Sequence, residues 1–163
     1  MITIRKATLK DASLIAELFD EFMKYHDEIV IPSDSRLIPH VAKKKNAKSL
    51  FKKFAIKNIK SNKSRLNIAE VDGKPAGYSL IYIKDNIPIF TLEKLGYFAD
   101  LFVKKEFRGM GISSKFKDEA IKWFKKKGMK YASIAVYPQN EHAHSIYKNW
   151  GFFDFHVEMR KKI

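Results

Sequence analysis

The sequence predicts a mixed α/β fold, and three features of its 163 residues predict it. Segments with helical and with strand-like apolar spacing are interspersed along the chain, which is typical of this class. Two apolar runs joined around Asp72-Gly73 predict an antiparallel hairpin in the first half. A strand–helix–strand passage in the second half predicts a parallel pair there. At roughly 100–200 residues per domain, residues 1–163 are expected to form a single domain.

Apolar periodicity predicts the elements in order. Strands are expected at residues 2–7, 66–71, 76–83, 97–103, 130–137 and 153–159, and helices at residues 12–23, 50–59, 114–127 and 140–149. Thr8 and Asp11 have the spacing of a capping box at the start of the first helix. From Phe153 to Met159 apolar and polar residues alternate, which predicts a final strand with one buried face.

Composition excludes several classes of protein. The chain has no cysteine, so disulfide frameworks, thiolate zinc sites and cysteine nucleophiles are excluded. The longest stretch without a charged residue, 131–140, is much shorter than the roughly 20 residues of a membrane-spanning helix. No positively charged region precedes an apolar stretch at the N-terminus, so we expect no signal peptide and a cytoplasmic location.

The formal net charge of +14 is concentrated in one basic segment. Residues 36–65 hold eleven Lys and Arg and no Asp or Glu. Such a segment either faces anions or is a solvated helix face, and lysines elsewhere, as at 125–127, favour the solvated face. Phe51 and Phe54 lie among its lysines, but no recognised nucleic-acid motif occurs, so nucleic acid is not the partner we expect.

A glycine-rich turn lies between the strand at 97–103 and the following helix. Glycines allow backbone N–H groups to converge, and a helix N-terminus adds unpaired donors with a partial positive charge, so this turn suits a phosphate or pyrophosphate. A dinucleotide fingerprint would need a third glycine at Ser114, and a phosphate loop would need Lys at Ile112. Taken alone, the turn also fits a tight connection without a ligand. Its residues are Arg108, Gly109, Met110, Gly111, Ile112 and Ser113.

This turn resembles the Arg/Gln-x-x-Gly-x-Gly/Ala signature of the GNAT superfamily of acetyl-CoA-dependent N-acetyltransferases, with Ser113 in place of the last Gly or Ala. A second signature follows in the expected order: Asn140 opens a helix, Tyr147 lies along it, and Gly151-Phe152 comes after it. Two linked motifs are more specific than either alone, and the resemblance is strongest over residues 66–160. It implies a central mixed, mostly antiparallel sheet flanked by helices, with a parallel pair of strands that splay apart.

The resemblance also implies an activity: an amine of a small molecule or protein attacks the thioester of acetyl-CoA directly, without a covalent enzyme intermediate. Tyr147 would lie near the sulfur and protonate the leaving thiolate. The pantetheine arm would lie between the splayed strands. The residues that would bind acetyl-CoA are Leu101, Val103, the turn from Arg108 to Ser113, and Asn140.

A base is needed because an alkyl amine arrives protonated, and Asp100 is the candidate on the strand at 97–103. Polyamine acetyltransferases of this superfamily carry a Glu-Asp pair here, whereas this chain has Ala99-Asp100, so a polyamine acceptor is not expected. His142 and His144 are two apart on a short helix and point to different faces, so we expect no metal site.

Two other functions remain open from the sequence. One is a non-catalytic module that binds acyl-CoA on the same fold, and the other is a basic nucleic-acid-binding module that uses residues 36–65. The oligomeric state is also open. A homodimer is common among the proteins that the chain resembles, and the final strand, if exposed, could pair across its interface.

Overall fold

The computed structural model describes residues 1–163, and its centre is one five-stranded sheet in the order β1-β2-β3-β4-β5. The first four strands pair antiparallel, and β4 pairs parallel with β5, so the predicted mixed sheet is confirmed. The strands are β1 (Ile2–Lys6), β2 (Ser64–Val71), β3 (Lys74–Asp85), β4 (Lys94–Val103) and β5 (Ala132–Ile134). The helices are α1 (Ala12–Val30), α2 (Ile38–Val41), α3 (Ala47–Lys60), α4 (Ile112–Lys126) and α5 (Glu141–Asn149).

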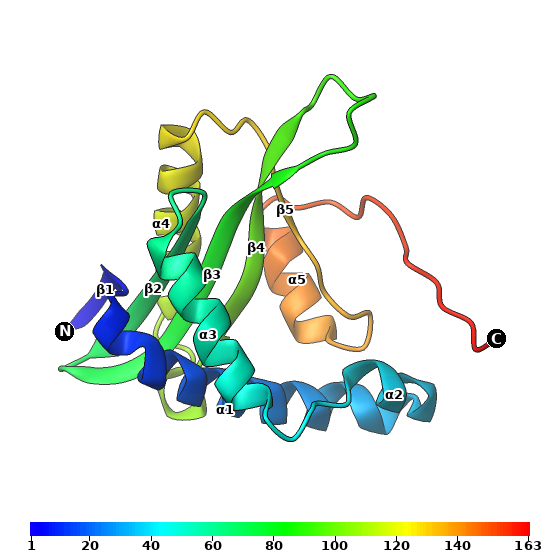
Figure 1. Cartoon of the computed structure of the whole chain (residues 1–163), viewed down its shortest axis with the longest axis horizontal. Helices are drawn as coiled ribbons and strands as arrows, with labels where there is room; N and C mark the ends of the chain where they lie inside the picture. The colour runs from blue at the N-terminus through cyan, green and yellow to red at the C-terminus, as the bar shows by residue number, and fades with distance from the viewer.

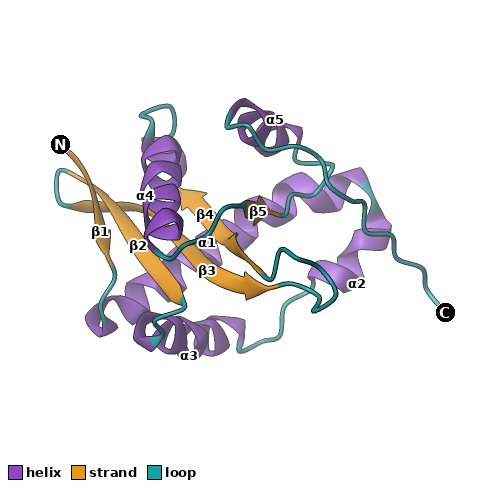
Figure 2. Ribbon diagram, turned by 90° about the horizontal axis from the view of Figure 1, so that it is seen from above, coloured by secondary structure: helices purple, strands orange, loops and turns teal.

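Helices cover both faces of the sheet, with α1 and α3 on one face and α4 on the other (Figure 2). The α1/α3 face is closed by a cluster in which Ile15 and Leu18 of α1 meet Tyr78 of β3 and Phe102 of β4. On the α4 face, the buried apolar side of α4 packs on β2, β3 and β4 in two further clusters. This three-layer arrangement fixes the ends of β4 and α4, between which the glycine-rich turn lies.

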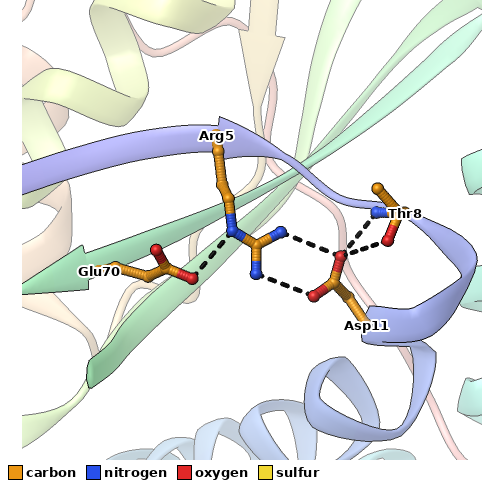
Figure 3. Close-up of polar contacts among 4 residues, drawn as sticks. All are labelled: Arg5, Thr8, Asp11 and Glu70. Atoms are coloured by element: carbon orange, nitrogen blue, oxygen red, sulfur yellow. Dashed lines mark hydrogen bonds and ion pairs between the residues drawn. The ribbon is translucent and has the colours of Figure 1, made fainter. Parts of the chain in front are cut away.

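An ionic network ties β1 to the neighbouring strand and to the turn before α1 (Figure 3). Arg5 of β1 donates to both carboxylate oxygens of Asp11, at 2.8 and 3.0 Å, and its Nε donates to Glu70 of β2 at 2.8 Å. Asp11 Oδ2 also accepts from the backbone N–H of Thr8 at 2.7 Å. The predicted pairing of Thr8 with Asp11 is therefore present, and Arg5 holds that carboxylate from the other side.

Two predicted strands differ from the structure. Residues 130–137 were expected to form one strand, but only Ala132–Ile134 pair with β4. The expected final strand at 153–159 is wrong for the single chain: these residues form no strand, and the apolar side chains of the alternating pattern are exposed. Alternation shows that a segment suits a sheet, but a strand forms only where a neighbouring edge is within reach.

The first helix extends seven residues further than the apolar spacing indicated, to Val30, and ends where Pro32 follows. None of the helices combines the length and apolarity that crossing a membrane requires.

Candidate functional site

The glycine-rich turn between β4 and α4 has backbone angles that require glycine. Gly109 and Gly111 have φ of 78° and 77°, in the left-handed region that side chains disfavour. A Cβ built at either position would meet no protein atom within 4 Å, so both glycines border open space. The turn is therefore shaped by its backbone and presents a surface on which a ligand could lie close to the main chain.

The N-terminus of α4 supplies unpaired donors to this surface. Gly111 is the N-cap, no side chain caps the helix, and the first backbone bond that returns to the turn runs from Lys115 N to Gly111 O at 3.1 Å. The N–H groups of the first turn, including those of Ile112 and Ser113, are left without a partner in the helix. Together with the helix dipole, these donors favour an anion such as a pyrophosphate.

The edge of β4 next to this turn is open because β4 and β5 diverge. Their pairing ends at Phe98 and Ile134, whereas β4 continues to Val103. The N–H of Gly96 points toward β5 and donates to the carbonyl of Tyr131, the residue before that strand, but the N–H of Lys104 points to β3, where it donates to Ala76 O.

A bulge explains this change of direction along β4. The register between β3 and β4 shifts where Leu80 and Ile81 pair with Asp100 and Phe98, so Ala99 is the extra residue. Backbone groups alternate along a strand, so beyond the bulge Leu101 and Val103 direct theirs away from β3, toward the open side. These are the two residues for which the resemblance implies backbone contacts with pantetheine.

The same bulge turns the side chain of Asp100 onto the α1/α3 face. Phe98 packs on the α4 face, while Ala99 packs on the α1/α3 cluster and Asp100 accepts a 3.0 Å hydrogen bond from the hydroxyl of Tyr78. Without the extra residue, Phe98 and Asp100 would share a face. Apolar sequence patterns contain no signal for this bulge, so the orientation of Asp100 was not predictable from them.

Burial raises the pKa of Asp100 to about 6, although the hydrogen bond from Tyr78 opposes the shift. Two further tyrosines, Tyr82 and Tyr97, have pKa values raised mainly by burial; Tyr82 adds to the shift of Tyr97, and the charge of Asp100 adds to both. Asp100 is thus a carboxylate in a cluster of phenols, with a pKa high enough to accept a proton and low enough to be mostly ionised at neutral pH.

Tyr147 lies on α5 and reaches β4 through aromatic contacts. Its ring centroid is 6.4 Å from that of Phe152, which is 5.9 Å from the ring of Phe98 on β4. Burial raises the pKa of Tyr147 to about 12, so its hydroxyl stays protonated at neutral pH. The phenol is therefore connected, through two packed rings, to the position where β4 and β5 separate.

Asn140 caps α5, because its Oδ1 accepts from the backbone N–H of Ala143 at 3.2 Å. The cap uses the carbonyl oxygen of the side chain, and the NH₂ group remains to donate to a ligand. A capping role and the predicted ligand contact are thus compatible.

Arg108, the first residue of the turn, is held by protein groups. Its guanidinium lies 3.8 Å from the ring centroid of Tyr25 on α1, and its Nε donates to Val103 O at 3.1 Å. Lys104 pairs with Glu21 of α1 at 3.2 Å. These contacts anchor the end of β4 to α1 and fix the turn relative to the α1/α3 face.

His26 of α1 is a polar group near this face that its sequence context did not single out. Its ring is 4.7 Å from Tyr137, which follows β5, and its buried Nδ1 has no hydrogen-bond partner. Burial lowers the pKa of His26, so the imidazole is neutral at neutral pH. A lone histidine on an apolar helix face is not distinctive in sequence, and only the fold brings it against Tyr137.

The basic segment is largely a solvated surface. Residues 36–65 span α2, α3 and the start of β2, and Lys52, Lys53 and Lys57 of α3 are exposed. Four of its eleven cations pair with acids from other segments: Arg36 with Asp34, Lys43 with Asp27, Lys48 with Glu17, and Arg65 with Glu119. No group of three or more His, Asp or Glu side chains could hold a metal ion.

Comparison with known proteins bears on the family and the fold of the chain. The model of the acetyltransferase (GNAT) family matches residues 16–152. An uncharacterized N-acetyltransferase of Methanocaldococcus jannaschii is 29% identical over 152 residues, which is 92% of this chain and 60% of that protein. The chain thus spans about three fifths of the length of that relative.

Two solved structures show the same fold. A protein of Bacillus halodurans, solved as a point mutant, has a TM-score of 0.81 at 21% identity over 99% of both chains. A protein of Clostridium acetobutylicum described as a predicted acetyltransferase, solved with acetyl-CoA, has a TM-score of 0.74 at 19% identity over 99% of this chain and 96% of that one. The match of the family model extends from α1 through the glycine-rich turn to Phe152, and the chain belongs to the GNAT family of acetyltransferases.

Proposed function

We propose that this protein transfers the acetyl group of acetyl-CoA to a primary amine of a small molecule or protein. The observation that carries the proposal is the uncapped N-terminus of α4, which follows Gly109 and Gly111 at the open edge of β4. A pyrophosphate fits there because backbone N–H groups converge and no side chain occupies the space above either glycine. The C. acetobutylicum structure, which holds acetyl-CoA, supports this choice of ligand.

The backbone of β4 continues this site toward the reacting centre. Leu101 and Val103 would donate and accept hydrogen bonds along the pantetheine arm, in the manner of an added strand. Asn140 would hold the same arm from the side of α5. The thioester then lies near the point where β4 and β5 separate, between Asp100 on one side and the aromatic contacts of Tyr147 on the other.

The residues fit a direct attack. Ionised Asp100 takes one proton from the ammonium group, directly or through a water, and the free amine attacks the thioester carbon. A backbone N–H of β4 stabilises the oxyanion. As the C–S bond breaks, the second proton passes from the nitrogen to the leaving sulfur, which gives the N-acetylated product and the CoA thiol.

The phenol of Tyr147 acts as a hydrogen-bond donor in this scheme. Its pKa of about 12 exceeds the roughly 8.5 of a thiol, so complete transfer of its proton to the thiolate is uphill. A hydrogen bond that strengthens as charge develops on sulfur stabilises the transition state without that transfer.

A thermal-shift titration tests the ligand first. A ligand that binds only the folded state stabilises it by about 2.7 kcal/mol at a hundred times its Kd, so acetyl-CoA and CoA should both raise the melting temperature, whereas NAD and ATP should not. Release of CoA thiol over a panel of amines then tests transfer. The chain has no cysteine, so protein thiols contribute nothing to the thiol signal.

Each outcome separates the candidates. A shift with acetyl-CoA together with thiol release that depends on an amine supports the enzyme. A shift without release for any amine would assign a non-catalytic acyl-CoA-binding module. No shift at saturating acetyl-CoA overturns the proposal.

A further inference from the structure

We propose that this protein docks on the surface of an anionic lipid bilayer with the end of the sheet at which β3 turns into β4. The tip of the β3–β4 hairpin enters the headgroup region, and the lysines around it lie on the lipid phosphates. Binding of this kind needs an apolar anchor with basic neighbours, and it does not need a helix that spans the bilayer. The surface is separate from the glycine-rich turn, which follows the opposite end of β4, so the proposal does not depend on acetyl transfer.

The first observation is that the topology of the sheet gathers lysines at one end. β2 and β4 run antiparallel to β3, and β5 runs parallel to β4, so the starts of β2, β4 and β5 lie beside the end of β3. We call the segments found there, residues 60–63, 84–94 and 125–131, the basic end. They contain eight exposed lysines and two acids, Asp85 and Glu93. The lysines are Lys60, Lys63, Lys84, Lys94, Lys125, Lys126, Lys127 and Lys130.

These lysines have no ion-pair partner within the chain. The lysines that form salt bridges all lie outside the basic end, as Lys43 and Lys48 do with acids of α1. The eight ammonium groups are therefore available to an external anion. Each lysine near an anionic lipid surface favours binding by about fivefold, and salt screens the attraction beyond about 10 Å at about 0.1 M.

The second observation is an apolar tip at the centre of the basic end. The hairpin projects past the rest of the sheet, at the same end as the C-terminus of α4 (Figure 1). At its tip Ile87, Ile89 and Phe90 are 59%, 82% and 50% exposed. Turns are usually built from polar residues and glycine, so three large apolar side chains at one tip indicate an apolar environment outside the chain.

The tip is ordered by its own hydrogen bonds. The N–H of Phe90 donates to Ile87 O at 3.1 Å, which closes a tight turn. Asn86 bridges the two arms, because its N–H donates to Glu93 O at 2.7 Å and its Nδ2 donates to Leu92 O at 2.9 Å. Backbone groups that are already paired cost less to move out of water, so the tip can enter the headgroup region without unfolding.

A lipid surface fits these side chains better than nucleic acid does. Single-stranded nucleic acid is bound by lysines together with aromatic rings on which its bases stack. Ile87 and Ile89, the two most exposed residues of the tip, are aliphatic and offer no stacking surface. Their burial requires an apolar phase, and the anionic surface of a bilayer combines such a phase with phosphates.

A second copy of the chain fits less well because of its charge. The other exposed apolar surface formed by a helix lies on α3, where Leu50 and Phe54 are 42% and 45% exposed. Lys44 lies at its edge, and Lys52 and Lys53 of the same helix are exposed. Contact between this surface and the basic end would bring like charges together, which disfavours association.

Sedimentation of the whole chain with lipid vesicles is the first test. The protein should bind vesicles of phosphatidylcholine mixed equally with phosphatidylglycerol, and pure phosphatidylcholine at least tenfold more weakly. Binding to the mixed vesicles should fall at least tenfold between about 0.05 M and about 0.5 M NaCl. Failure to bind the mixed vesicles, or equal binding to both compositions, overturns the proposal.

Exchange of the tip tests the apolar anchor. Ile87→Ser with Ile89→Ser should weaken binding to the mixed vesicles about tenfold or more, because both side chains leave the lipid. The matched control is Leu9→Ser with Leu50→Ser, at residues that are 52% and 42% exposed outside the basic end. It should leave binding unchanged, and equal losses for the two pairs would overturn the role of the tip. Melting temperatures verify that all variants are folded.

Exchange of lysines separates the basic end from the net charge of the whole chain. Lys126→Gln with Lys130→Gln should weaken vesicle binding about tenfold or more. Lys44→Gln with Lys45→Gln removes the same charge from exposed positions before α3 and should have little effect. Equal losses would show that the total charge of +14, and not the basic end, attracts the vesicles, which overturns the proposal.

A fluorescent label tests insertion directly, because the chain has no cysteine of its own. Ile89→Cys carrying an environment-sensitive dye should shift to shorter wavelength on the mixed vesicles, whereas the same dye at Leu9→Cys should not. An unchanged spectrum at position 89 overturns insertion of the tip. Single-stranded RNA that binds through Lys126 and Lys130 without any binding to vesicles, or a dimer that Ile87→Ser with Ile89→Ser dissociates, would assign the basic end to nucleic acid or to a second copy instead.

Discussion

Asp100 combines two properties that a base for amine chemistry needs: a raised pKa and a place beside the diverging strands. Its pKa of about 6 predicts that activity rises with pH through about 6 as the carboxylate ionises. Asp100→Asn keeps an oxygen that accepts the hydrogen bond of Tyr78 but cannot take a proton. We expect turnover to fall about 10²-fold or more and this rise to disappear from the pH profile of kcat.

The same shift predicts a gain in stability for Asp100→Asn. A carboxyl group with a raised pKa binds its proton more tightly in the folded state, so the free energy of unfolding falls as pH rises from about 4 to about 6. Above pH 6 the ionised side chain of Asp100 lowers the free energy of unfolding by as much as about 2–3 kcal/mol, and an asparagine at this position does not. Thermal melts at pH 5 and pH 8 measure it. The control is Asp85→Asn at the exposed end of β3, and equal effects of both variants on activity and stability would contradict the assignment.

Tyr147 is the second residue whose role can be isolated by removing one atom. Tyr147→Phe keeps the ring that packs on Phe152 and removes only the hydroxyl. We expect kcat to fall about 10²-fold with little change in the Kd of acetyl-CoA, because the hydroxyl acts as charge develops on the sulfur. Thiol release and the thermal-shift titration give the two quantities. Tyr131→Phe, at a tyrosine that is 61% exposed, is the matched control, and turnover of Tyr147→Phe that equals that of this control would remove the hydroxyl from the mechanism.

Among the elements, α4 is flanked by two glycines of the same backbone geometry, and only the one at its N-terminus borders the expected anion site. Gly111 before its first residue and Gly128 after its end both have φ of 77°, and a Cβ at either would meet no atom within 4 Å. Gly111→Ala and Gly128→Ala should therefore cost similar stability, about 1–2 kcal/mol. Only Gly111→Ala narrows the surface expected to hold the pyrophosphate, so it alone should weaken acetyl-CoA binding, by about tenfold or more in the titration. Equal losses of affinity would mean that the ligand lies elsewhere.

The strands show what sequence patterns could and could not predict. The hairpin at Asp72-Gly73 and the turn from Arg108 to Ser113 were predictable because their residues specify local backbone angles. The bulge at Ala99 was not, since it arises from the register of two strands. The final strand was predicted from the alternation of apolar and polar residues at 153–159. A strand forms only if it pairs with the edge strand of a sheet, and the sequence of this segment does not identify such a partner.

At the scale of the whole molecule, the stability of the fold depends on pH in opposite directions through two carboxylates: the pKa of Asp11 is lowered and that of Asp100 is raised. Asp11 is tied to Arg5 and Thr8, and the hydrogen bonds from Arg5 hold its pKa well below the ordinary value. A depressed pKa contributes stability that is present above about pH 4 and is lost as pH falls further. This network joins β1 to β2 and to the start of α1, so its loss loosens the edge of the sheet opposite β5.

We therefore expect Asp11→Asn to lower the free energy of unfolding by about 1–2 kcal/mol at pH 7, since the side chain is only 12% exposed and one oxygen of a two-point contact with Arg5 is lost. The difference from the unchanged protein should shrink as pH falls below about 4, because the unfolded chain then binds a proton at Asp11 that the folded protein, with its lowered pKa, does not yet bind. Urea unfolding at several pH values measures it. Glu158→Gln, which breaks an exposed pair with Arg160, is the control and should change stability by less than about 0.5 kcal/mol. A loss for Asp11→Asn that stays constant from pH 7 to pH 3 would show that packing, rather than charge, holds β1 in place.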